Sequence, residues 1–237
     1  MEINMWYPSW SYAQYGYLLS TLRMVDYLSV DPPEGYSLAQ VRGIQEEIQE
    51  WEKEDEPIWG TKSDTVPTNI ICIMNESYSD LRVVGDFNTD EPTMIILFGD
   101  HQPSVEDTFY EALYGCSLEE AAGEDYLRRY ITPFLVWTNY DTESMLEENL
   151  SAMFLSCTIL ERANLEITDF ISFLRFLYRQ CPVVHILGYY TSDMVWESWS
   201  HWEEKKEYPL FHWFDMLQYH NMFERNRITS LFQVSDG

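Results

Sequence analysis

The sequence predicts an α/β fold with a mainly parallel β-sheet. Short continuous runs of apolar and β-branched residues occur at 69–74, 93–98 and 133–137, a pattern typical of strands buried on both faces. Segments with helical periodicity separate these runs, and strands that alternate with helices indicate a layered domain. Hydrophobic residues make up 46 % of the 237-residue chain, which is enough to form a core and excludes general disorder.

Residues 1–65 are expected to form a helical N-terminal segment that ends in a linker. Residues 1–12 are aromatic and irregular, and residues 15–28 carry a rough helical stripe of apolar side chains. Ser37 is placed to cap a second helix that extends from residue 38 to about residue 53.

Residues 66–190 are expected to form the main α/β domain, and residues 191–237 an aromatic tail that packs on it. Besides the three strands, the main domain should contain a fourth strand at 183–187 and helices at 105–114, 151–163 and 168–179. The tail should be helical around residues 210–223.

The charge balance is strongly acidic. The chain has 14 Lys and Arg against 40 Asp and Glu, so its formal net charge is −26. This surplus disfavours a nucleic-acid phosphate binder and an anionic membrane face, and it suits solubility or the binding of hard divalent cations. We interpret the acidic stretch at 46–56 as a solvated helix face that runs into the linker.

No targeting signal or membrane span is expected. The chain begins MEIN, without the basic and apolar regions of a signal peptide, and its apolar runs are far shorter than the ~20 residues of a membrane helix. We therefore expect a soluble chain of undetermined compartment. The four cysteines show no CxxC spacing, which favours free and mostly buried thiols.

Two of the predicted strands are followed by side chains that can bind a metal. Glu76 comes shortly after the first strand, and Asp100 and His101 come after the second. Ligands of open α/β sheets bind at the carboxyl ends of the strands, and two carboxylates with an imidazole suit Mn²⁺ or Zn²⁺ better than Ca²⁺. The alternative is that these residues only cap the next helix, near Ser104, or the turn that follows the first strand.

The remaining histidines and the tryptophans allow two interpretations. His185 follows Val184 and is expected to be a core or edge histidine. The tail is rich in tryptophan, which could form a sugar-stacking surface but more often fills a core: Trp196, Trp199, Trp202 and Trp213.

The strand-end motifs also carry a family resemblance. The sequences PTNIICIMNESYSDL at 67–81 and LFGDHQPS at 97–104 resemble lipoteichoic acid synthase-like proteins, which are phosphoglycerol transferases of the sulfatase/alkaline phosphatase superfamily. The likeness continues through TPFLVWTNYD at 132–141 and LQYHNMF at 217–223, so it covers most of the chain. It implies a reduced, layered sulfatase-like domain, with Glu76, Asp100 and His101 as ligands of Mn²⁺, or alternatively of Mg²⁺ or Zn²⁺.

The resemblance also implies a substrate class and a location. Members of the family act on glycerol-phosphate or lipid-linked phosphodiesters and are membrane-anchored, with an extracellular domain. Here the family's membrane helices are absent, although GYLLS at 16–20 and EGYS at 34–37 resemble the segment that links them to the extracellular domain.

A central block of the family pattern is also missing, because the likeness runs to about residue 87 and resumes near residue 90. In the family that block contains the threonine that acts as nucleophile and as fourth metal ligand. Thr89 is a weak replacement, since it lies among acidic residues with no base near it in sequence. We therefore expect an impaired phosphoglycerol transferase or phosphodiesterase. The alternatives are an inactive metal- or phosphate-binding remnant, or an acidic interaction protein.

Overall fold

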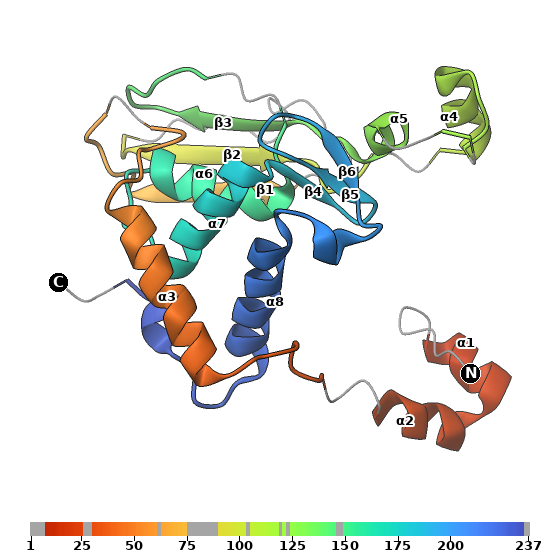
Figure 1. Ribbon diagram of the computed structural model, residues 1–237. Helices are drawn as coiled ribbons and strands as arrows, with labels where there is room; N and C mark the ends of the chain where they lie inside the picture. The colour runs from red at the N-terminus through yellow and green to blue at the C-terminus, as the bar shows by residue number, and fades with distance from the viewer. Residues whose placement is uncertain are drawn as a thin grey trace.

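The computed structural model describes residues 8–25, 30–60, 63–74, 90–102, 105–118, 120–121, 124–145 and 149–234 (Figure 1). The fold is a mixture of α-helices and two small β-sheets, which confirms the α/β class. The helices are α1 (Pro8–Tyr15), α2 (Tyr17–Val25), α3 (Leu38–Glu52), α4 (Asp107–Tyr114), α5 (Glu124–Leu127), α6 (Leu155–Arg162), α7 (Asp169–Gln180) and α8 (Tyr208–Phe223).

The first sheet has the strand order β1-β2-β3, with β1 at Asn69–Met74, β2 at Thr93–Phe98 and β3 at Phe134–Thr138. β1 and β2 are parallel, but β2 and β3 are antiparallel, so the expectation of a mainly parallel sheet is wrong. The physical reason is the path between β2 and β3. Figure 1 shows α4 and α5 beyond the end of the sheet, so the chain returns from the end that it left and does not cross a face.

The predicted fourth strand exists, but it is not part of the first sheet. β4 (Val183–His185) pairs with β5 (Gly188–Tyr190), and β5 pairs with β6 (Trp196–Ser198), all antiparallel. A Cβ atom at Gly188 would come within 2.2 Å of the Glu197 carbonyl oxygen, so the approach of β5 to β6 requires glycine at this position.

Burial in the first sheet is concentrated in its central strand. All of β2 except Phe98 is buried, as expected, and Met94 and Ile96 form a small core with Ala163. For β1 the expectation of burial on both faces is wrong, because this strand lies at an edge and its Ile70 and Ile71 are exposed. β3 alternates between half-buried and exposed positions, so the expectation of burial on both faces is wrong for this strand as well.

The main core is formed by α3, α7 and α8, which Figure 1 shows below the sheets. It draws on each of the three regions 1–65, 66–190 and 191–237, and its fully buried members include Ile44, Ile48, Phe173, Leu177 and Leu217. Ser37 caps α3 as predicted, since its side chain accepts a 3.1 Å hydrogen bond from the Gln40 backbone N–H.

The acidic stretch at 46–56 is exposed along α3 at Glu46, Glu47 and Glu50, as expected, but Asp55, which follows the helix, is half-buried. The Asp55 carboxylate accepts ion pairs from Arg175 at 2.9 Å and from Arg179 at 2.7 Å. Arg175 also pairs with Glu161 at 3.0 Å, and both of these side chains are about nine-tenths buried. This network ties the segment after α3 to α6 and α7.

Before α3 the chain contains two helices, α1 and α2, where a single helix at 15–28 was predicted. Gly16, at φ 80°, separates α1 from α2, and residues 8–12 are helical where an irregular segment was expected. The end of the predicted helix, at 26–28, lies outside the described residues. No helix in the described part of the chain has both the length and the apolar character needed to cross a membrane.

Candidate functional site

The candidate site lies at the carboxyl ends of β1 and β2. The two strands are parallel and in register, with Met74 opposite Phe98 at their last residues. In sequence, Glu76 therefore follows the end of β1 by two positions, and Asp100 follows the end of β2 by two positions. Glu76 itself lies outside the described residues, as do Ser77, Ser79 and Thr89.

The loop after β2 is held to the segment that enters β3. The Gly99 backbone N–H donates to the Pro133 carbonyl at 3.3 Å, and the Thr132 hydroxyl donates to the Gly99 carbonyl at 2.9 Å. The Gln102 side-chain amide donates to the carbonyl of Ile131. A Cβ atom at Gly99 would lie 3.1 Å from the Thr132 Cβ, so glycine permits this close contact. These contacts fix the backbone on both sides of Asp100 and His101.

The Asp100 and His101 side chains face each other. His101 Nε2 lies 3.4 Å from Asp100 Oδ2, and the His101 backbone N–H donates to Asp100 Oδ1 at 2.9 Å. His101 Nδ1 lies 2.8 Å from the Gln102 carbonyl oxygen. Because a carbonyl oxygen only accepts, Nδ1 must carry the hydrogen. In the neutral ring the lone pair is then on Nε2, the nitrogen that faces the carboxylate, and an Nδ1–H held in this way is typical of a metal-ligating histidine.

The alternative in which Asp100 or His101 caps the next helix is wrong for α4. This helix begins at Asp107, and its N-cap residue is Glu106, which makes no side-chain capping hydrogen bond. Asp100 is therefore six residues before the cap position. The cap of a turn after β1 cannot be assigned, because residues 75–89 lie outside the described residues.

The pair is accessible but incomplete as a metal centre within the described residues. The His101 side chain is 62 % exposed and that of Asp100 is 26 % exposed, so a ligand can reach both. No group of three or more His, Cys, Asp or Glu side chains suited to a metal occurs in the part of the chain that the structure covers. An oxygen and a nitrogen donor still fit Mn²⁺ or Zn²⁺ in chemical type, and a further ligand must come from elsewhere, such as Glu76.

Thr93 also lies between the two motifs, and the structure describes it. Its hydroxyl is not placed for catalysis beside Asp100. Thr93 is the first residue of β2, is fully buried, and donates its hydroxyl to the Glu91 carbonyl at 2.9 Å. It lies at the opposite end of the strand from Asp100, so its hydroxyl cannot reach a ligand held there.

Two histidines outside the site have structural roles. His185 lies in the edge strand β4, as expected, and its Nδ1 accepts a 3.2 Å hydrogen bond from the Leu187 N–H. His220 is fully buried, which the sequence did not indicate. Its Nε2 accepts from the Ile228 N–H at 2.8 Å and its Nδ1 lies 2.8 Å from the Tyr36 hydroxyl, so the ring joins α8 to the segment that precedes α3.

All four cysteines lie in described positions and none forms a disulfide. Cys157 and Cys181 are buried, as expected, and burial raises the pKa of the Cys157 thiol to about 11 and that of Cys181 to about 12. Both are therefore poor nucleophiles near neutral pH. Cys72 is exposed because β1 is an edge strand, and Cys116 is half-buried.

Comparisons with known proteins give one short match. No family model matches the chain, and no solved structure matches it. Over 110 residues, the chain is 29 % identical to a protein of Rhizobium meliloti (strain 1021) that is named for the modification of cyclic β-1,2-glucan. The match covers 44 % of this chain and 17 % of that protein, so it spans only a small part of the relative.

Proposed function

We propose that the chain is a sulfatase-like protein of the phosphoglycerol transferase type, which holds a divalent cation with Glu76, Asp100 and His101. Mn²⁺ is the cation that the sequence resemblance favours, with Mg²⁺ and Zn²⁺ as alternatives. When bound, it would act as a Lewis acid on a phosphoryl oxygen of a phosphodiester. We also propose that the β1-β2-β3 sheet and its covering helices are a reduced form of the layered sulfatase-like domain.

The observation that supports this proposal best is the orientation of the His101 ring. Nδ1 is bonded to a backbone carbonyl, and Nε2 faces a carboxylate oxygen 3.4 Å away. With a proton on Nε2 this contact is an ion pair, and with a neutral ring the Nε2 lone pair faces the carboxylate, where a divalent cation could take the place of the proton. Asp100 and His101 follow the end of β2, and Glu76 follows the end of the parallel strand β1 in sequence. Because the ends of parallel strands meet at one sheet edge, Glu76 is our candidate for the third donor.

The acceptor that we propose is a glucan hydroxyl. The relative is named for glucan modification, and a phosphoglycerol transferase can attach its group to a sugar hydroxyl. The P–O bond to the sugar would form as the P–O bond to the donor's alcohol breaks, and that alcohol would leave with the proton of the sugar hydroxyl. In that reaction the residues of this chain would orient the donor phosphate at the end of β2, with Asp100 and His101 in the positions that the Thr132 and Pro133 contacts give them.

A second candidate is a protein that binds the metal or a phosphate and does not catalyse transfer. The placement of Thr93 favours this candidate, because its buried hydroxyl is at the wrong end of β2 and the family's nucleophile segment has no counterpart in the sequence. Without an activated nucleophile, the cation could bind a phosphodiester but could not complete a group transfer through a covalent intermediate.

Hydrolysis of bis(4-nitrophenyl) phosphate, measured with and without MnCl₂, separates the two candidates. The transferase proposal predicts Mn²⁺-dependent release of nitrophenolate that is lost in Glu76→Ala. It also predicts that release is retained in Glu203→Ala, which removes an exposed carboxylate from a different part of the chain. Bound Mn²⁺ without turnover would contradict the transferase and support the binding protein. Turnover that survives Glu76→Ala would contradict the proposed site.

A further inference from the structure

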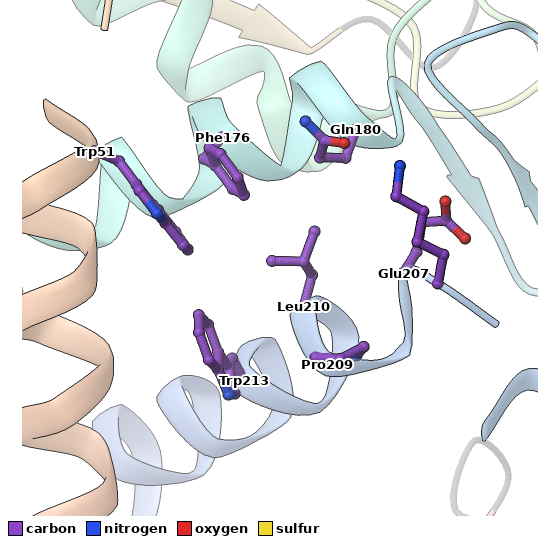
Figure 2. Close-up of a pocket in the computed structure, with 8 residues that line it drawn as sticks. Trp51, Phe176, Gln180, Glu207, Pro209, Leu210 and Trp213 are labelled. Atoms are coloured by element: carbon purple, nitrogen blue, oxygen red, sulfur yellow. The ribbon is translucent and has the colours of Figure 1, made fainter. Parts of the chain in front are cut away.

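A pocket of about 280 Å³ lies between α3, α7 and α8, and none of its lining residues belongs to the loop that carries Asp100 and His101 (Figure 2). It is an open pocket with both apolar and polar lining residues: Trp51, Phe176, Gln180, Lys206, Glu207, Pro209, Leu210 and Trp213. Ligand pockets for drug-sized molecules enclose roughly 300–1,000 Å³, so this volume suits a single small ring.

One side of the pocket is an aromatic cluster. The Trp51 ring is stacked on Phe176, with centroids 3.8 Å apart and an interplanar angle of 15°. It is also near-parallel to Trp213, with centroids 5.8 Å apart and an angle of 22°. All three side chains are half-buried, which leaves part of each aromatic surface open to a ligand. Because the rings come from three different helices, their mutual packing fixes this wall of the pocket.

The other side of the pocket is polar. Figure 2 shows Gln180 and Glu207 across the cavity from Trp51. The Glu207 carboxylate is positioned by the Tyr189 hydroxyl, which donates to it at 3.1 Å. The Gln180 amide and the Lys206 ammonium make no hydrogen bond or ion pair in the described part of the chain, so both can bind a ligand. Together they provide donors and acceptors but little net charge.

We infer that this pocket binds one neutral pyranose unit of a glucan. The apolar C–H face of a pyranose packs against aromatic rings, and its hydroxyl groups need both donors and acceptors, which Gln180, Lys206 and Glu207 supply. An anionic ligand is disfavoured by Glu207 and by the net charge of −26. An apolar partner would bury these polar groups without hydrogen bonds. The choice of a glucan rests on the proposed function.

Binding of the β-1,2-linked glucose disaccharide to the whole chain tests this inference, with saturation-transfer NMR for contact and calorimetry for the dissociation constant. Gln180→Ala and Lys206→Ala change side chains at the pocket rim and should each weaken binding about two- to tenfold, which corresponds to the loss of one hydrogen bond. Gln218→Ala is the matched control, because Gln218 is a half-buried glutamine of α8 that does not line the pocket.

The inference is overturned if the disaccharide does not bind, if the three variants bind it equally, or if toluene occupies the pocket and the disaccharide does not displace it. The double variant Asp100→Ala/His101→Ala separates this result from the proposed function. It should bind the disaccharide with unchanged affinity. Sugar binding without any Mn²⁺ effect would contradict the metal site alone, and a Mn²⁺ effect without sugar binding would contradict the pyranose site alone.

Discussion

The Asp100–His101 pair owes its orientation to backbone contacts on both sides. Gly99 bonds to Pro133 and Thr132, and His101 Nδ1 bonds to the Gln102 carbonyl. A site held in this way needs little side-chain packing around it, which agrees with the 62 % exposure of the His101 side chain. The Thr132 hydroxyl is the contact that can be removed with the smallest change of shape.

Thr132→Val should lower the free energy of unfolding by about 1 kcal/mol, because the hydrogen bond to the Gly99 carbonyl is lost while the volume is kept. Urea unfolding followed by circular dichroism measures this change. Thr108→Val is the control, since Thr108 is an exposed residue of α4. Equal unfolding free energies for the two variants would show that the Thr132 hydroxyl does not hold the loop.

His220 makes stability depend on pH. Burial lowers its pKa below the ordinary value of 6.5; Glu224 opposes this shift and Arg227 adds to it. Because Nε2 already accepts the Ile228 N–H, a proton on Nε2 would face another donor. The unfolded chain therefore takes up this proton at a higher pH than the folded chain does. The His220 contribution is fully present above about pH 6.5 and is lost as the pH falls from there toward the lowered pKa.

We expect the unfolding free energy in urea to fall between pH 7.5 and pH 5.5, and expect His220→Gln to reduce this dependence. His201→Gln, which changes an exposed histidine, should leave the dependence unchanged. If His201→Gln reduced the pH dependence as much as His220→Gln, the buried ring would not be its source.

Among the helices, α7 buries three apolar side chains in the main core: Phe173, Leu174 and Leu177. The Thr168 hydroxyl caps α7 by accepting a 3.3 Å hydrogen bond from the Ile171 backbone N–H. One face of the helix buries Phe173 and Leu177 against α3 and α8. Asp169 on its first turn accepts a 2.9 Å hydrogen bond from the Gln49 side chain of α3. The helix is thus fixed by its cap, its apolar face and its polar edge.

Leu177→Ala should destabilise the protein by about 2–5 kcal/mol, because it opens a cavity at a fully buried position. Leu113→Ala is the matched control: Leu113 of α4 is 67 % exposed, so its removal should change stability by less than about 0.5 kcal/mol. Thermal and urea unfolding of the two variants provide the comparison. Similar losses in both would contradict the assignment of α7 to the core.

Local sequence patterns predicted most individual elements but not how the strands pair. The apolar runs marked β1 and β2, and Ser37 and Thr168 marked the starts of two helices, because these signals act within a few residues. The direction of β3 and the separate sheet of β4 depend on the path of the intervening chain. Similarly, apolar periodicity indicated neither α1 nor the break at Gly16, because it does not report the positive-φ backbone conformation of this glycine.

At the scale of the whole molecule, the main core joins segments that are far apart in sequence. Val41, Phe154, Leu177 and Leu231 belong to the same buried cluster. The strand-end rule predicted the Asp100–His101 pair because both residues directly follow one strand. Trp213 was one of the sugar-stacking candidates, and both it and Trp199 pack against the main core. The aromatic pocket as a whole could not be predicted, since Trp51, Phe176 and Trp213 come from three helices. Trp202, one of the predicted sugar-stacking candidates, has a side chain outside the described ones.

The net charge of −26 also acts on the whole molecule. Carboxylates are spread over the surface, so divalent cations will associate loosely at many positions and will screen the repulsion among them. An increase in melting temperature with Mn²⁺ is therefore no evidence of a specific site without a variant that lacks the ligands. This nonspecific screening should raise the melting temperature equally in the unaltered chain and in a variant that differs from it at only two residues.

Thermal unfolding in EDTA and in Mn²⁺, for the unaltered chain and for Asp100→Ala/His101→Ala, tests the central claim of a metal site most directly. A cation that binds only the folded state raises the melting temperature by mass action. The metal-site proposal predicts a Mn²⁺-dependent increase in the unaltered chain that is larger than any increase in the double variant, with a smaller difference for Mg²⁺. Equal increases in both proteins, or none in either, would contradict a metal site at the ends of β1 and β2.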